Sequence, residues 1–190
     1  MSLIQTQIEG TSALLQHAFS IDFEDPSASR VVLARNASPR EQAEAHLYRD
    51  GEVFYVPGSA ISRLLREAGA SHKLKGSRQR VKFLVPAAVV VTEDALPLLD
   101  PSSGLPLATW EVDSRPVVIL ATKGRIMRHR PRFEKWGLAI QLEIDEEVLP
   151  EDLVHVLLAE GGRRIGIGNF RPEKGGPFGR FRVVQWRRIP

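Results

Sequence analysis

The 190-residue sequence contains no cysteine, so it offers neither disulfides nor thiolate ligands for a metal. It also lacks an apolar run as long as a membrane helix requires, so we expect no membrane partner. The first ten residues, MSLIQTQIEG, lack the basic stretch and apolar stretch of a signal peptide, which favours a cytoplasmic location. Hydrophobic residues make up 43% of the chain and charged residues 26%, values that favour a globular protein over a disordered one.

Positive charge is unevenly distributed along the chain, although the formal net charge is only +3. Acids dominate residues 93–113 and 143–152. The cations gather in three stretches, 73–82, 123–135 and 163–188. Most of them are arginine, whose planar guanidinium binds phosphate oxygens and stacks on bases. Clusters of this kind indicate a nucleic-acid binder, and a solvated protein surface is the alternative.

The N-terminal half shows one well-defined helix. Residues 11–23, TSALLQHAFSIDF, predict a first strand, and residues 24–50 predict a long loop that contains a short helix in PREQAEAHLYRD. Residues 53–56 predict a strand that ends at Pro57-Gly58. Ser59 then stands where a helix N-cap belongs, and Gly69 marks the end of that helix. Its buried face is predicted from residues at helical spacing: Ile61, Leu64, Leu65 and Ala68.

The C-terminal half predicts a buried strand over residues 80–92, with a break at Pro86, and then turns. A hairpin with an arginine-rich returning strand and a Lys123-Gly124 turn follows, and then an alternating strand over residues 136–145. The next helix begins at Pro150 and is expected to end at Gly161-Gly162. Its core stripe is predicted to consist of Leu153, Val154, Val156, Leu157 and Leu158. A final strand is expected over residues 178–189.

Without the hairpin, the predicted order is strand, helix, strand, strand, helix, strand. This order is typical of the α+β class with a ferredoxin-like, RRM-like antiparallel sheet and two helices on one of its faces. The other face is then left for a ligand, as in RNA-recognition modules. We expect residues 1–190 to form a single domain, with an inserted hairpin at about 93–136.

Two segments have the composition of an anion-binding site. The helix after Pro57-Gly58 presents free N–H groups at its start, with Arg63 and Arg66 on its exposed side; a well-capped core helix is the alternative. The segment RRIGIGNFRPEKGGPFGRF, residues 163–181, interleaves glycines with cations, and Phe170 and Phe178 there are candidates to stack on bases. It matches neither a Walker loop nor a dinucleotide fingerprint, and a flexible turn is its alternative.

Together, VPGSAISRLLR (residues 56–66) and IGIGNFRPEKGGPFGRF (residues 165–181) resemble two motifs of the RAMP superfamily of CRISPR systems, especially its guide-RNA-binding backbone subunits. In that family both motifs contact the RNA backbone. Pro57, Gly58, Ser59 and Arg66 match the first motif, whereas Ala60, Ser62 and Arg63 replace its usual serine, lysine and glycine. Arg63 would then take the place of the lysine, and residues 93–136 lie where the family inserts a thumb-like hairpin.

The resemblance implies sequence-independent binding of single-stranded RNA, as a guide RNA in a filament of copies of the same chain beside other CRISPR effector subunits. RNA and single-stranded DNA remain alternatives. The residues that it implies for binding are Ser59, Arg63, Arg66, Arg125, Arg128, Arg130, Arg132, Gly166, Gly168, Arg171, Lys174, Gly175, Gly176 and Arg180. A second hypothesis is a small phage-encoded subunit mimic or single-stranded-nucleic-acid-binding protein, which acts in phage DNA metabolism or inhibits a host complex.

Catalysis is not expected. In one branch of the family an aspartate before the Pro-Gly-Ser cuts RNA, but here Glu44 is the only acid near that place and Asp50 lies too close to the helix. A third hypothesis, a metal-independent endoribonuclease, would use His17 or His46 as a general base. The five histidines show no metal-ligand spacing, and we expect neither a metal nor a cofactor.

Overall fold

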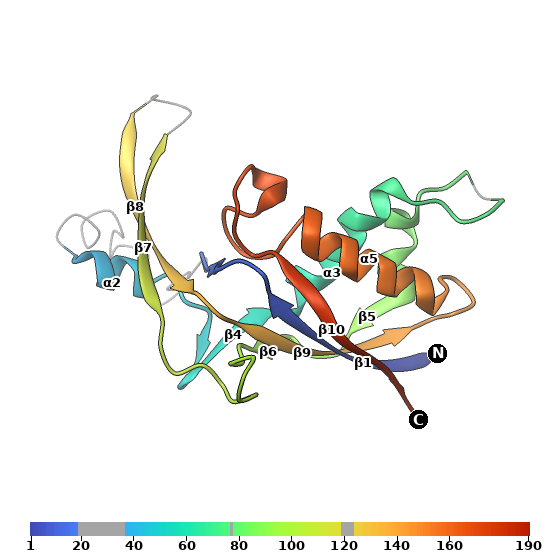
Figure 1. The fold of residues 1–190 in the computed structure, drawn as a ribbon. Coiled ribbons are helices and arrows are strands. Elements are labelled where there is room, and N and C mark those ends of the chain that lie inside the picture. Colours follow the sequence, from blue (N-terminus) through green and yellow to red (C-terminus); the bar gives the residue numbers. More distant parts are fainter. Residues whose placement is uncertain (19–36, 77, 119–123) are drawn as a thin grey trace, which may run out of the picture.

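The computed structural model describes residues 1–18, 37–76, 78–118 and 124–190 (Figure 1). They form an α+β structure with antiparallel sheets, as the sequence predicts. Within these ranges, none of the helices has both the length and the apolar character needed to cross a membrane.

The main sheet has four antiparallel strands in the order β10-β1-β9-β5. Its strands are β1 (Ser2–Gly10), β5 (Val89–Val91), β9 (Gly137–Ile144) and β10 (Phe181–Ile189). Side chains alternate between the faces, so Ile4 and Ile8 of β1 are buried whereas Gln7 is exposed. The alternation predicted for β9 is confirmed. Its buried residues are Leu138, Ile140, Leu142 and Ile144.

Two amphipathic helices cover the buried face of this sheet (Figure 1). Helix α3 (Gly58–Ala68) precedes β5 in the chain, and α5 (Glu151–Arg164) precedes β10. The predicted buried face of α3 is confirmed, and Leu64 and Leu65 are fully buried. The core continues through both helices and the sheet, because their buried apolar residues form one cluster that includes Trp136.

Two smaller three-stranded sheets lie beside the main one. The first has the order β2-β8-β7 and consists of β2 (Leu14–Leu15), β8 (Arg125–Phe133) and β7 (Glu111–Val118). The second has the order β3-β4-β6 and consists of β3 (Arg49–Asp50), β4 (Val53–Pro57) and β6 (Ala95–Pro97). The predicted β7–β8 hairpin is therefore present (Figure 1), whereas Lys123 of its predicted turn lies outside the described residues.

Short helical segments connect these strands. They are α2 (Pro39–Glu44), α4 (Val85–Ala88) and the 3-10 turns η1 (Gly69–Ser71), η2 (Val81–Phe83) and η3 (Pro172–Lys174). Helix α2 is the predicted short helix of PREQAEAHLYRD. It begins with a capping box in which the side chains of Ser38 and Glu41 each accept from the other's backbone N–H. The predicted loop before it, residues 24–36, lies outside the described residues.

Two strand predictions are wrong. The first long strand is β1 and not residues 11–23, of which only β2 is a strand among the described residues. The sequence of β1 hides it, because Ser2 and Thr6 occupy core-facing positions where apolar residues would be expected; Thr6 donates its hydroxyl to the carbonyl of Gln185 at 2.7 Å. Residues 80–92 form η2, α4 and the short β5 instead of one strand.

Three helix details also differ from expectation. The N-cap of α3 is Pro57, not Ser59, and no side chain caps it. Helix α5 continues past Gly161 and Gly162 to Arg164. These glycines do not end the helix; they allow close packing, since a side chain at either position would collide with Leu64 of α3 or Phe181 of β10. Val156, expected in the core stripe, is 43% exposed. The predicted ends at Gly69 and Pro150 agree with the caps of α3 and α5.

Candidate nucleic-acid interface

The glycine loop, residues 165–181, packs against the segment that follows β1. Residues 11–15 make backbone hydrogen bonds to it, including Asn169 N to Leu15 O at 2.7 Å and Gly179 N to Ala13 O at 2.8 Å. Leu14 and Leu15 also form β2, which pairs with β8 of the hairpin. The same short segment therefore holds the glycine loop on one side and the hairpin on the other, so both stand on one side of the molecule (Figure 1).

An open cleft of about 300 Å³ lies where the two predicted motifs meet. One wall is the start of α3, from Pro57 to Arg63, and the opposite wall is the glycine loop from Gly166 to Arg171. Strand β4 leads directly into α3, so the helix begins at the cleft. The first N–H groups of a helix have no acceptor within it, and its positive end favours an anion. The cleft therefore combines a helix start with arginines.

A buried glutamine, Gln16, also lines the cleft. Gln16 is 2% exposed; its side chain donates to the carbonyl of Tyr55 at 2.8 Å and accepts from the N–H of Tyr48 at 2.9 Å. Both tyrosines flank the β3–β4 turn, and Tyr48 lines the cleft. Because both the oxygen and the nitrogen of the Gln16 amide have partners, this part of the cleft lining is fixed independently of any ligand.

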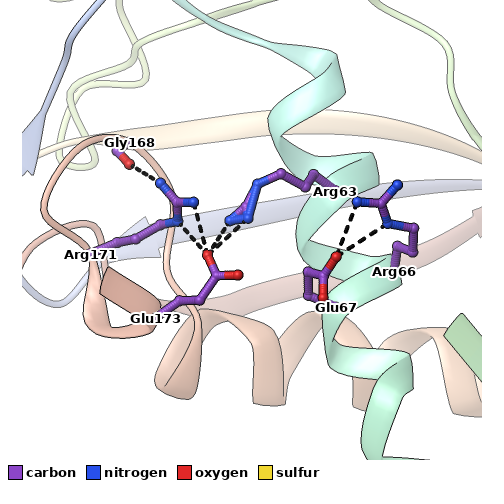
Figure 2. A network of polar contacts seen from close by, with 6 residues as sticks. All are labelled: Arg63, Arg66, Glu67, Gly168, Arg171 and Glu173. Carbon is purple, nitrogen blue, oxygen red and sulfur yellow. Dashed lines mark hydrogen bonds and ion pairs between the residues drawn. The ribbon is translucent and has the colours of Figure 1, made fainter. Parts of the chain in front are cut away.

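Arg63 and Arg171, which line the cleft from distant parts of the chain, converge on the carboxylate of Glu173 (Figure 2). Glu173 Oε2 accepts from Arg63 Nη1 at 2.9 Å and from Arg171 Nε at 2.9 Å. Arg171 also donates to the carbonyl of Gly168 at 2.8 Å. Burial, followed by the charge of Arg171, lowers the pKa of the Arg63 guanidinium below its ordinary value. Glu173 compensates only one of these two positive charges, so the group stays cationic and attracts an anion.

The other residues of these two motifs lie around this centre. Ser59 is at the exposed start of α3 and lines the cleft. Arg66 lies about one turn beyond Arg63 and pairs with Glu67 at 3.0 Å (Figure 2). Lys174, Gly175 and Arg180 are exposed on the glycine loop. The structure therefore brings the two motifs together at one place.

Most glycines of the loop allow it to fold against the protein's own backbone. At Gly168 φ is +76°, and a Cβ there would lie 2.5 Å from the carbonyl oxygen of Leu15. A Cβ at Gly176 would lie 1.8 Å from the carbonyl oxygen of Phe170. Only glycine fits such positions, so these residues shape the loop. Close approach to a ligand by Gly166, Gly168, Gly175 and Gly176 stays a prediction.

The hairpin arginines do not form one uniform group. Alternation along β8 puts Arg128, Arg130 and Arg132 on one face and Arg125 on the other. Arg130 is only 9% exposed and lies beside the buried Asp113. Arg132 pairs with Glu134, whereas Arg125 and Arg128 are exposed. Of the four predicted residues, Arg128 is therefore the one that is both exposed and on the same face of β8 as Arg130.

An aromatic stack connects the hairpin to the glycine loop. The guanidinium carbon of Arg115 in β7 lies 4.7 Å from the ring centre of Phe178, and Asp113 holds Arg115 Nε at 2.8 Å. Phe178 contacts Phe170 at 6.1 Å between ring centres. Phe170 is 38% exposed and has a φ of +48°, which a bulky residue rarely adopts. Phe170 therefore offers a partly exposed aromatic ring beside Phe178.

Two histidines stack near the cleft. The ring of His17, which lines the cleft, lies 4.0 Å from that of His46. Burial lowers the pKa of His17 to about 4, and the charges of His46, Arg130 and Arg128 contribute in the same direction. The hairpin arginines therefore act electrostatically on the cleft.

Sequence reasoning did not select several of these residues for the site. Glu173, Arg115, Gln16 and Tyr48 were not chosen, because their partners lie far away in the chain or on another strand. For Arg115, a signal was present: alternation along the hairpin would have placed it on the face of Arg128.

Comparisons with known proteins give a fold but no family. No protein-family model and no curated protein sequence matches the chain. A chain of the Type III-B Cmr-beta bound to cognate target RNA is similar in structure, with a TM-score of 0.59 and 10% sequence identity over 99% of this chain. The present chain spans about 60% of the length of that chain.

Two further structures match more loosely. Cmr6 from Pyrococcus furiosus has a TM-score of 0.43 and 11% identity over 96% of this chain and 99% of its own. A chain of a Type IV-B CRISPR complex has a TM-score of 0.49 and 13% identity over 98% of this chain and 90% of its own. The similarity to the Cmr-beta chain shows that this protein shares the fold of that chain.

Proposed function

We propose that this protein binds the backbone of single-stranded RNA in the cleft between α3 and the glycine loop, as a subunit of a CRISPR-type ribonucleoprotein. The observation that supports this most is the convergence of Arg63 and Arg171 beside the start of α3 in one open cleft. Guanidinium groups and helix N–H groups both favour phosphate, and contacts to phosphate do not read sequence. A guide RNA, which must be held whatever its sequence, is a suitable ligand.

The hairpin supplies the second part of this proposed interface. Arg128 adds charge close enough to His17 to contribute to its lowered pKa, and Phe170 provides a ring on which a base stacks. In a ribonucleoprotein, the hairpin is the element that reaches toward a neighbouring copy of the chain and encloses the strand. The similarity to a chain from an RNA-bound Type III-B structure supports this assignment.

We assign the main sheet and its helices to a ferredoxin-like arrangement within one domain, residues 1–190. The order β1, α3, β5, β9, α5, β10 and the sheet order β10-β1-β9-β5 support the arrangement. The continuous buried cluster that includes Ile4 and Phe181 supports one domain.

We infer that the protein acts by binding and not by catalysis. A pKa of about 4 leaves His17 with little basicity at neutral pH, so it would be a weak general base. The Nδ1 atom of His46 faces the carbonyl of Ala18 at 3.2 Å. Incubation with structured RNA tests this inference; product that disappears in His17→Ala would contradict it.

Titration of a labelled oligonucleotide at several salt concentrations tests the binding itself. Neutralisation of roughly five phosphates predicts a slope of log affinity against log salt of about −3.5. Oligonucleotides of different sequence should give similar affinities. A slope near zero would overturn the proposal, and a strong dependence on sequence would exclude backbone recognition.

A further inference from the structure

A second cationic surface lies away from the cleft. We name residues 72–83, HKLKGSRQRVKF, the basic finger; all of them except residue 77 are among the described residues. Five of its residues are lysine or arginine: Lys73, Lys75, Arg78, Arg80 and Lys82. The sequence contains no acid between Glu67 and Glu93. In Figure 1 this segment projects beyond α3 and α5 on the side opposite the hairpin.

The base of the finger is firmly attached to the helices. Lys73 and Arg80 face each other in an antiparallel bridge, and the N–H of Val81 donates to the carbonyl of His72 at 3.0 Å. His72 Nε2 also lies 3.0 Å from a carboxylate oxygen of Glu160 in α5. The cations beyond this base are exposed. The finger therefore presents its charge from a defined position.

One face of α3 connects the cleft to this finger. Arg63, Glu67 and Ala70 are four and three residues apart, so they share a face of the helix and of the turn after it. Arg63 stands at the cleft, and the carbonyl of Ala70 accepts from Arg80 Nη1 at 2.6 Å. A rise of 1.5 Å per residue separates Arg63 from Ala70 by about 10 Å.

Charges of both signs lie along α3 between the cleft and the finger. Arg66 is exposed one turn after Arg63 and pairs with Glu67 at 3.0 Å, and its side chain extends away from that of Arg63 (Figure 2). At the far end, Phe83 is 61% exposed and the ammonium of Lys82 lies 5.1 Å from its ring centre. An exposed aromatic ring beside unburied cations is the composition of a surface that binds a single strand. The alternative, a solvated charged loop, requires neither the exposed ring nor the alignment with the cleft.

We propose that the basic finger is a second contact for the strand held in the cleft, with Lys73, Lys75, Arg78 and Lys82 binding its phosphates. The strand leaves the cleft at Arg63 and follows the exposed face of α3. This inference rests on the proposed function, because it assumes a strand in the cleft. It adds that the binding site extends to the end of the molecule opposite the hairpin.

The test uses oligonucleotides of two lengths. Oligouridine of about 5 nucleotides fills the cleft alone, whereas one of about 20 nucleotides reaches the finger. In the double variant Lys75→Gln/Arg78→Gln, we expect the long oligonucleotide to bind about 10-fold more weakly. Its log–log salt slope should be shallower by about 1.4, the value for two lost phosphate contacts. Binding of the short oligonucleotide should not change.

A matched control removes the same charge elsewhere. Arg182→Gln/Arg187→Gln takes two exposed cations from β10, and we expect it to leave the length dependence intact. Thermal melting of both variants checks that each is folded. Arg80 is kept, because it anchors the finger to Ala70.

Each outcome decides the matter. Loss that is confined to the long oligonucleotide supports the inference. Equal loss for both lengths, or no loss, overturns it and leaves the cleft proposal standing. Polyglutamate is titrated in parallel as a model of an acidic protein. If the double variant binds polyglutamate more weakly but keeps its affinity for RNA, the inference is overturned and the finger is identified as a surface for acidic protein. If the unaltered protein binds neither oligonucleotide, the proposed function itself fails.

Discussion

The arginines of the cleft and those of the hairpin differ in how they are held. Arg63 and Arg171 are fixed by Glu173, and Arg171 is further oriented by the carbonyl of Gly168. On the hairpin, Arg125 and Arg128 are exposed and have no ion pair among the described residues. Fixed guanidiniums give a defined geometry, whereas unrestrained ones mainly add charge. The cleft should therefore determine where a strand binds, and the hairpin should determine how strongly positive charge attracts that strand.

Removal of the fixed arginines should have the largest effect. In Arg63→Gln/Arg171→Gln we expect RNA affinity to fall about 100-fold, because two charge-assisted contacts are lost. Fluorescence titration measures this loss, and circular dichroism checks that the fold is kept. The variant Arg182→Gln/Arg187→Gln removes equal charge from β10 and serves as control. A loss no larger than that of the control would contradict the special role of the cleft.

The stack between the two regions should contribute through its ring and not through charge. In Phe170→Ala, RNA affinity should fall about 10-fold, as expected for one stacked base, with an unchanged salt slope. Phe170→Leu keeps apolar bulk without a π face and should behave like the alanine variant. A titration in which the slope also becomes shallower would show that the loop itself had been displaced.

The two faces of the hairpin should be distinguishable by single substitutions. Arg128→Gln should weaken binding about 3-fold and reduce the slope by about 0.7, since one phosphate contact is lost. Arg125→Gln, on the opposite face of β8, is the matched control and should have a smaller effect. Equal effects would mean that the hairpin acts only through its total charge.

Neutralisation of the shared carboxylate should strengthen binding slightly. Glu173→Gln keeps the shape of the side chain but no longer compensates Arg63 and Arg171, so we expect RNA affinity to rise about 2-fold. Glu146→Gln breaks an ion pair with Arg188 instead and is the control. Weaker binding in Glu173→Gln would indicate that the fixed geometry matters more than the added charge.

The smallest effect should appear in stability against pH. The folded protein holds the pKa of His17 at about 4, below its ordinary 6.5. Between pH 6.5 and about 4, the unfolded chain therefore binds a proton at His17 more readily than the folded protein does. Stability should therefore decrease as pH falls from about 6.5 to 4. Thermal melting should show a smaller decrease in His17→Gln, and identical pH profiles of the two proteins would contradict the assignment. Because His17 is partly exposed, the difference is expected to be small.

Local patterns predicted the parts of the fold that depend on neighbouring residues. Helix α3 begins at the Pro57-Gly58 pair, shows apolar residues at helical spacing and ends at Gly69, so its prediction was largely correct. The hairpin and β9 were recognised from alternation and turn residues. The two motifs predicted to bind RNA were also selected from sequence, and residues of both line one cleft.

The errors arose where distant contacts override local preference. Gly161 and Gly162 look like a helix end, but their missing side chains make room for α3 and β10. In residues 80–92, Val81 of η2 and Val85 of α4 are buried in helical turns, although their β-branched side chains favour a strand. The pairing of Arg63 with Glu173 joins residues 110 positions apart, and no local pattern reveals it.

Crosslinking of a 4-thiouridine oligonucleotide, followed by mass spectrometry, tests the central claim most directly. Our account predicts that the main crosslinks fall in residues 56–66 and 165–181, which line the cleft together. The face of the main sheet not covered by α3 and α5 carries Gln5 and Gln141, and it is the surface that RNA-recognition modules use. Crosslinks concentrated on that face, with none in the two motifs, would contradict the claim that RNA binds in the cleft.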